Sequence, residues 1–210
     1  GEEIPVIGMG SSDTFDVGDD AASRDGLRGV LQSLVEGGGR VIDTSPMYGR
    51  AETVLGDLIG DLGLGPKLWY ATKVWTRGRE VGTRQIDESF ARLRTKKLDL
   101  LQIHNLLDWR EHVPTLRALQ AAGRVRYSGI THYRADAHAD DAICAALHAL
   151  RIHQVCAVVC ARQGRQASRL VAQRQTDRPR LGQALRVRCS NSKSGASDRS
   201  GRRRQWICLF

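Results

Sequence analysis

The sequence lacks the features that define several large classes of protein. No uninterrupted apolar stretch approaches the roughly 18 residues of a membrane span. No charged segment followed by an apolar stretch opens the chain, so we expect no secretory signal peptide and a cytoplasmic protein. Aromatic residues make up only 5% of the chain, and none lies between residues 161 and 205. A segment without large apolar side chains has little to bury, so we expect the core to lie elsewhere.

Cysteine is absent until position 144, and all five cysteines lie in the last third of the chain. They are Cys144, Cys156, Cys160, Cys189 and Cys208. Three residues separate Cys156 from Cys160, and His148 and His153 are near, but no second pair follows at the spacing of a zinc site. We therefore predict neither a metal site nor a disulfide framework.

The net charge of +9 is distributed unevenly. Residues 1–150 hold 18 Lys and Arg against 21 Asp and Glu, whereas residues 151–210 hold 14 against 2. A basic excess favours nucleic-acid binding when it covers a folded surface. Because this excess is confined to one end of the chain, we interpret it as a solvated charge run and do not expect nucleic acid as a partner.

The first 150 residues alternate between short apolar runs and longer amphipathic stretches. The apolar runs are Ile4–Met9, Val41–Ile42, Leu68–Ala71, Leu98–Ile103 and Val125–Ile130. From the second run onward they recur at the interval of a strand–helix unit, and glycines follow three of the helical stretches where a left-handed cap is needed. This alternation predicts a parallel sheet covered by helices, either open and doubly wound or closed as a (β/α)₈ barrel.

Polar residues stand at the carboxyl ends of the predicted strands, where such folds carry their chemistry. Asp43 follows the second run with Tyr48 five residues later, Lys73 follows the third run, and His104 follows the fourth. A tyrosine phenol has a reference pKa of about 10, and a neighbouring ammonium group favours its ionised form. The set therefore suits protonation of a carbonyl oxygen, with Asp43 orienting the lysine and His104 donating a hydrogen bond.

These residues and their neighbours resemble the aldo-keto reductases, a family of NADPH-dependent (β/α)₈-barrel oxidoreductases. The matching stretches are Pro5–Gly10, Val41–Gly49, Ala71–Val74, Leu101–Asn105 and Gly123–Thr131. The resemblance places the family's catalytic tetrad on Asp43, Tyr48, Lys73 and His104. It implies reduction of an aldehyde or ketone to an alcohol with Tyr48 as the general acid, with NADPH as cofactor and NADH as the alternative.

The resemblance also assigns residues around this tetrad. Thr131 and His132 occupy positions that contact the nicotinamide carboxamide, and Gln154 matches a further nicotinamide contact, while Asp43 also belongs to the cofactor site. Trp75 and Trp109 lie just past the third and fourth strands, where the family has its substrate-pocket walls.

Each of these residues also has a purely structural interpretation. Asp43 alone could cap a helix, Tyr48 or His104 could be a packed polar residue, and Lys73 could be a solvated surface lysine. Trp75 and Trp109 could equally be ordinary packing at the rim. The occurrence of all four polar residues at strand ends, in one order, favours the catalytic interpretation.

Beyond the first 155 residues the alternation stops, and strands seven and eight of a barrel are not recognisable. We predict an incomplete barrel over residues 1–155, with Ile152–Val155 as a sixth strand, and a basic tail over residues 156–210. We interpret the tail as disordered or as an out-of-frame translation; a natural tail is the rival interpretation. Because the missing strands would carry the loops that hold cofactor phosphates, we expect weak NADPH binding. The alternative function is an inactive, truncated remnant whose basic tail binds polyanions.

Overall fold

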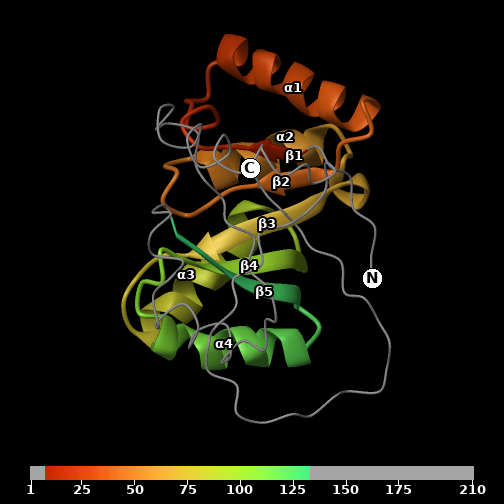
Figure 1. Ribbon diagram of the computed structural model, residues 1–210. Helices are drawn as coiled ribbons and strands as arrows, with labels where there is room; N and C mark the ends of the chain where they lie inside the picture. The colour runs from red at the N-terminus through yellow and green to blue at the C-terminus, as the bar shows by residue number, and fades with distance from the viewer. Residues whose placement is uncertain (1–7, 133–210) are drawn as a thin grey trace, which may run out of the picture.

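Five parallel strands form the centre of the computed structural model, which describes residues 8–132 (Figure 1). The strands are β1 (Gly8–Gly10), β2 (Val41–Asp43), β3 (Trp69–Val74), β4 (Leu98–His104) and β5 (Val125–Thr131). Their order across the sheet is the order along the chain. A doubly wound sheet reverses its strand order at a switch point, whereas a barrel adds each strand beside the last. The described strands therefore follow the barrel arrangement, one of the two that the sequence left open.

Helices connect the strands and lie on one side of the sheet (Figure 1). They are α1 (Ala21–Glu36), α2 (Ala51–Asp61), α3 (Arg79–Arg92) and α4 (Trp109–Ala121), with a short 3₁₀ turn, η1 (Gly65–Lys67), before β3. The predicted sixth strand, the missing strands seven and eight, and the boundary at residue 155 lie outside the described residues. No helix within residues 8–132 has both the length and the apolar composition needed to cross a membrane.

Glycines follow the ends of three helices, as the sequence predicts. Gly38, Gly63 and Gly123 have φ angles of 82°, 62° and 70°, values that residues with a Cβ rarely adopt, and each lies two residues past the end of a helix. Of two neighbouring apolar residues of α1, Leu31 is fully buried, whereas Val30 is 46% exposed.

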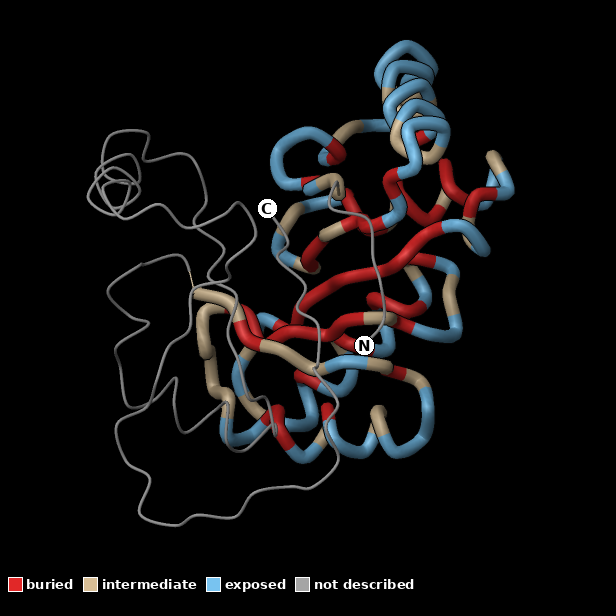
Figure 2. Tube along the Cα trace, turned by 45° about the vertical axis from the view of Figure 1, so that its right-hand side comes forward, coloured by how far each residue is buried: buried red, intermediate tan, exposed pale blue. Residues whose placement is uncertain are grey.

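The two faces of the sheet bury different sets of apolar residues. Ile42, Leu101 and Ile103 point toward the helices and belong to the main core, which also includes residues of all four helices. The opposite face has its own small cluster, formed by Val41, Trp69, Ala71 and Leu100. Figure 2 shows long buried stretches in the middle of the sheet, where β3 and β4 lie, whereas β1 and β5 are mostly of intermediate burial. Full burial of each large aliphatic side chain contributes about 1.5–3 kcal/mol, so the strands anchor the fold.

A buried carboxylate fixes α2 against its neighbours. Glu52 is 1% exposed and accepts hydrogen bonds from Thr72 Oγ1 (2.6 Å), Ser89 Oγ (3.0 Å) and Arg92 Nε (2.9 Å). The backbones approach closely here, since a Cβ on Gly56 would lie 1.9 Å from the Arg92 carbonyl oxygen. Because α2 follows the loop after β2, this contact also fixes the end of that loop.

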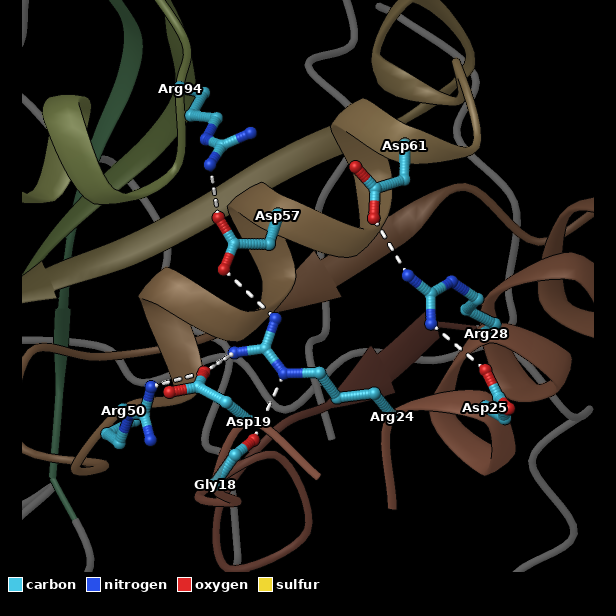
Figure 3. A network of polar contacts seen from close by, with 9 residues as sticks. All are labelled: Gly18, Asp19, Arg24, Asp25, Arg28, Arg50, Asp57, Asp61 and Arg94. Carbon is cyan, nitrogen blue, oxygen red and sulfur yellow. Dashed lines mark hydrogen bonds and ion pairs between the residues drawn. The ribbon is translucent and has the colours of Figure 1, made fainter. Parts of the chain in front are cut away.

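A second polar network lies at the surface between α1 and α2 (Figure 3). Arg24 donates to the Gly18 carbonyl oxygen (3.0 Å), Asp19 (2.6 Å) and Asp57 (3.1 Å). Arg28 bridges Asp25 on its own helix and Asp61 on α2, and Arg94 and Arg50 add further ion pairs. Within this network, the pairs Arg24–Asp57 and Arg28–Asp61 join α1 to α2.

Candidate active site

The four predicted catalytic residues lie together at the carboxyl ends of the strands. Asp43 is the last residue of β2, Lys73 is the last but one of β3, and His104 is the last of β4. Tyr48 lies in the loop between β2 and α2. Because the strands are parallel, their carboxyl ends share one edge of the sheet, and residues up to 61 positions apart in the chain meet there. We refer to Asp43, Tyr48, Lys73 and His104 as the site quartet.

Lys73 is the centre of this group. Its Nζ atom donates to Asp43 Oδ2 at 2.7 Å and to the Thr44 carbonyl oxygen at 2.9 Å, and the residue is only 4% exposed. The same Nζ lies 5.1 Å from the centre of the Tyr48 ring. A buried ammonium needs partners for its protons, and here a carboxylate and a carbonyl supply two of them. The positive charge is thus held within reach of the phenol.

Asp43 balances this charge in a buried position. Burial raises the pKa of its carboxyl above the ordinary value, and the Lys73 ammonium opposes that effect by favouring the ionised form. Its Oδ2 atom binds Lys73, whereas the buried Oδ1 atom has no hydrogen-bond partner in the described part of the chain. A carboxylate oxygen left in this state can accept a hydrogen bond from a bound ligand.

His104 is neutral at physiological pH. Burial first, and the nearby Lys73 charge second, lower the pKa of His104 to about 4. Its ring meets the Tyr48 ring edge to face, with the two centres 6.1 Å apart. Its Nδ1 atom lies 3.1 Å from Ser45 Oγ. A neutral imidazole has one N–H to donate, so which nitrogen carries the proton decides what His104 can do.

Backbone hydrogen bonds hold the loop that carries Tyr48. The Thr44 amide donates to the Ala71 carbonyl oxygen of β3 (2.9 Å), and the Tyr48 amide donates to the Ser45 carbonyl oxygen (3.0 Å). Gly49 has a φ angle of 56°, and a Cβ at this position would lie 2.2 Å from the Asp16 carboxylate. The tight turn therefore requires glycine and places Tyr48 above the strand ends.

The predicted nicotinamide contacts are described only in part. Thr131 ends β5 opposite His104 in the strand register, and its Oγ1 accepts the Asn105 amide at 3.4 Å. His132 follows it and is half-buried. Gln154 lies outside the described residues. Thr131 thus lies beside His104 of the site quartet, and His132 is the next residue along the chain; their role in cofactor binding remains a prediction.

The two predicted pocket tryptophans have different environments. Trp75 is 40% exposed just past β3, and the Gln85 amide binds its backbone twice, accepting from the Trp75 N–H (2.7 Å) and donating to its carbonyl oxygen (3.1 Å). Trp109 begins α4, packs against the main core, and has the Arg110 guanidinium 4.4 Å above its ring. An exposed tryptophan at the strand ends, with its backbone held by Gln85, suits a pocket wall better than one packed into the core.

Sequence reasoning missed two polar residues of this edge. Ser45 lies within a motif that the sequence singles out, but nothing in the sequence indicates its contact with His104, 59 positions away. Gln102 is 8% exposed beside Lys73 in the strand register, and its Oε1 atom is buried without a partner among the described residues. Its position two residues before His104 on the same strand is the signal that could have identified it.

Comparison with known proteins shows which protein family this chain is similar to. The model of the Aldo/keto reductase family matches residues 6–164. Methylglyoxal reductase YeaE of Escherichia coli is 32% identical over 135 residues, which are 61% of this chain and 46% of that protein. Aldo-keto reductase YhdN of Bacillus subtilis is 27% identical over 121 residues, 50% of this chain and 36% of that protein. The chain therefore spans less than half the length of these curated relatives.

Solved structures give the same result for the fold. The aldo/keto reductase of Klebsiella pneumoniae, solved in complex with NADP and acetate, superposes with a TM-score of 0.55 and 29% sequence identity. The superposition covers 64% of this chain and 48% of that one. With a family match over most of its length and a strand order typical of a barrel, the chain belongs to the aldo/keto reductase family.

Proposed function

We propose that the site quartet reduces an aldehyde or ketone to an alcohol with NADPH, with Tyr48 as the proton donor. One observation carries the proposal: the Lys73 ammonium is buried between the Asp43 carboxylate and the Tyr48 ring. A positive charge fixed beside a phenol stabilises the phenolate that remains after the proton has left. No metal is needed for this chemistry.

The residues present fit the cofactor that the family implies. Asp43 Oδ1 and Gln102 Oε1 are buried acceptors without partners in the described residues, and both lie on the inner side of the strand ends. Such atoms match hydroxyl and amide donors like those of a nucleotide ribose and a carboxamide. Asp43, Thr131 and His132 would hold the nicotinamide end. When bound, NADPH supplies the hydride that the carbonyl carbon receives.

The chain's own residues supply the proton and the orientation. The substrate oxygen accepts the Tyr48 proton while the carbonyl carbon is reduced, and Lys73 stabilises the phenolate that forms. Neutral His104 donates a hydrogen bond to the same oxygen and so fixes its position. Asp43 keeps Lys73 charged and oriented. Trp75 forms an exposed apolar wall beside the reacting group.

The test is NADPH oxidation that depends on an added carbonyl compound, followed by NADPH absorbance in the full chain. Methylglyoxal is the first substrate, because one relative is named for it. Since weak NADPH binding is expected, the assay covers a wide range of NADPH concentrations, with a fluorescence titration to measure binding itself.

Replacing Tyr48 by Phe should lower kcat by about 10²–10⁴-fold, because the proton donor is lost. The matched control is Tyr70→Phe, which removes a phenol that faces the helix-side core. Tyr70→Phe should leave the rate within about twofold. Equal rates for the wild type and Tyr48→Phe would refute Tyr48 as the acid. Binding to heparin without any carbonyl-dependent oxidation would favour the polyanion-binding alternative.

A further inference from the structure

The Ser45 side chain is a buried polar group that no step of the proposed mechanism uses. Ser45 is fully buried at the start of the loop after β2, and its Oγ atom lies 3.1 Å from His104 Nδ1. The Met47 amide also donates to this oxygen, at 3.4 Å. The Ser45 carbonyl oxygen accepts a hydrogen bond from the Tyr48 amide at 3.0 Å. Ser45 therefore contacts both the His104 imidazole, through its hydroxyl, and the Tyr48 backbone amide, through its carbonyl oxygen.

The hydrogen-bond inventory of Ser45 fixes the direction of its bond to His104. A hydroxyl has one hydrogen to donate and two lone pairs to accept. In the described part of the chain, Oγ contacts only the Met47 amide, which is a donor, and His104 Nδ1. If Nδ1 also donated, the hydroxyl hydrogen would be buried without an acceptor, which costs about 1–3 kcal/mol. The hydroxyl therefore donates to Nδ1.

This direction determines the tautomer of His104. A neutral imidazole carries one proton, so a ring that accepts at Nδ1 carries its hydrogen at Nε2. We propose that Ser45 is a positioning residue that holds His104 as the Nε2–H tautomer, with that N–H available to the substrate oxygen. The spectroscopic part of this proposal stands alone, and its consequence for catalysis rests on the proposed function.

The geometry also explains why a short hydroxyl side chain is suited to this position. Ser45 lies two residues after Asp43. A serine hydroxyl is separated from the backbone by a single methylene group, and this short side chain is long enough to reach His104 Nδ1. Through its carbonyl the same residue positions the Tyr48 amide. Ser45 thus links the loop that carries Tyr48 to the His104 ring at the end of β4.

Nitrogen NMR of the full chain tests the tautomer without any cofactor or activity. In ¹⁵N-labelled protein at neutral pH, the His104 signals are assigned by their loss in His104→Gln. We expect Nε2 to show the shift of a protonated ring nitrogen and Nδ1 that of an unprotonated one. A proton on Nδ1 in the wild type would overturn the proposal, whatever the enzyme's activity.

Variants at position 45 test the role of the hydroxyl. Ser45→Ala should shift the two nitrogen signals toward the average of both tautomers and lower kcat about tenfold or more, with a smaller change in KM. Ser45→Thr keeps the hydroxyl and should restore the tautomer and most of the rate. Ser89→Ala is the matched control, because it also removes a buried hydroxyl, here from the Glu52 carboxylate.

The outcomes separate this proposal from the proposed function. Unchanged nitrogen signals in a folded Ser45→Ala variant would overturn the role of Ser45 even if the wild type reduces carbonyls. The expected signals in a wild type that reduces no carbonyl would support the tautomer and refute the function. If Ser45→Ala does not fold by circular dichroism, the wild-type and Ser45→Thr spectra still decide the tautomer.

Discussion

The buried pair Asp43–Lys73 and the surface network of α1 and α2 use the same kinds of charge at similar distances. Lys73 lies 2.7 Å from Asp43, and Arg28 lies 2.8 Å from Asp61 in the network of Figure 3. Their exposure differs: the side chains of the buried pair are 5% and 15% exposed, and those of the surface pair are 33% and 51% exposed. Contact distance alone therefore does not distinguish a buried pair of the candidate site from a surface contact.

Solvent accounts for the difference. Water screens the surface pair, so such contacts contribute about 0–1 kcal/mol each. Burial removes that screening, so the Lys73 charge acts on every neighbour, and together with burial it lowers the pKa of His104. The surface network orients α1, whereas the buried pair sets the protonation of the site. Three changes test this contrast.

The largest effect is expected for Lys73→Met. This change leaves the Asp43 carboxylate buried without its partner, which should lower the free energy of unfolding by about 3–5 kcal/mol in urea titrations at neutral pH. Lys67→Met, at an exposed lysine in η1, is the control and should change it by less than about 0.5 kcal/mol. The double variant Asp43→Asn with Lys73→Met should recover most of the loss, because no charge remains buried. A loss below about 1 kcal/mol in the single variant would contradict the contrast.

An effect of intermediate size is expected when the pH is lowered, because protonation of His104 changes the free energy of unfolding. The folded state keeps this imidazole neutral down to about pH 4, whereas the unfolded chain protonates it near its ordinary pKa of 6.5. Stability from this residue is therefore fully present above pH 6.5 and is lost as the pH falls toward 4, by about 3 kcal/mol. Urea titrations between pH 7 and 4 should show a shallower loss in His104→Gln. Parallel curves for the two proteins would contradict the lowered pKa.

The smallest effect is expected for Arg28→Ala. Removing the contacts of Arg28 with Asp25 and Asp61 should lower the free energy of unfolding by less than about 1 kcal/mol, and added salt should reduce the difference further. Arg24→Ala sharpens this comparison, since Arg24 is only 13% exposed and donates to three acceptors. It should cost about 1–3 kcal/mol. A larger loss for Arg28→Ala than for Lys73→Met would reverse the contrast.

Much of the described fold could be predicted from the sequence. The apolar runs around Ile42 and Leu101 form β2 and β4. A strand inside a helix-covered parallel sheet is buried on both faces, so a short, continuous apolar run is typical of it. The carboxyl ends of those runs gave Asp43 and His104, since parallel strands bring such ends to one edge. The choice between an open sheet and a barrel could not be made from the runs, because their spacing is the same in both.

The environments of individual side chains were not predictable in the same way. Trp75 and Trp109 both follow the end of a strand within a few residues, yet Trp75 is 40% exposed and Trp109 packs on the core. Glu52 looks like an ordinary residue of a first helical turn, but it is buried by donors from β3 and α3. Such outcomes depend on which distant side chains come within a few ångströms.

The sequence by itself determined where the strands lie to within a few residues, which polar residues stand at their carboxyl ends, and which family the chain resembles, because these follow from local pattern and motif. Only the tertiary structure decided the contacts, the burial and the protonation states of these residues. It buried Lys73 against Asp43, lowered the pKa of His104, and placed the Ser45 hydroxyl on its ring. The physical reason is that desolvation and hydrogen bonding act over the few ångströms between side chains, and the fold alone sets those distances.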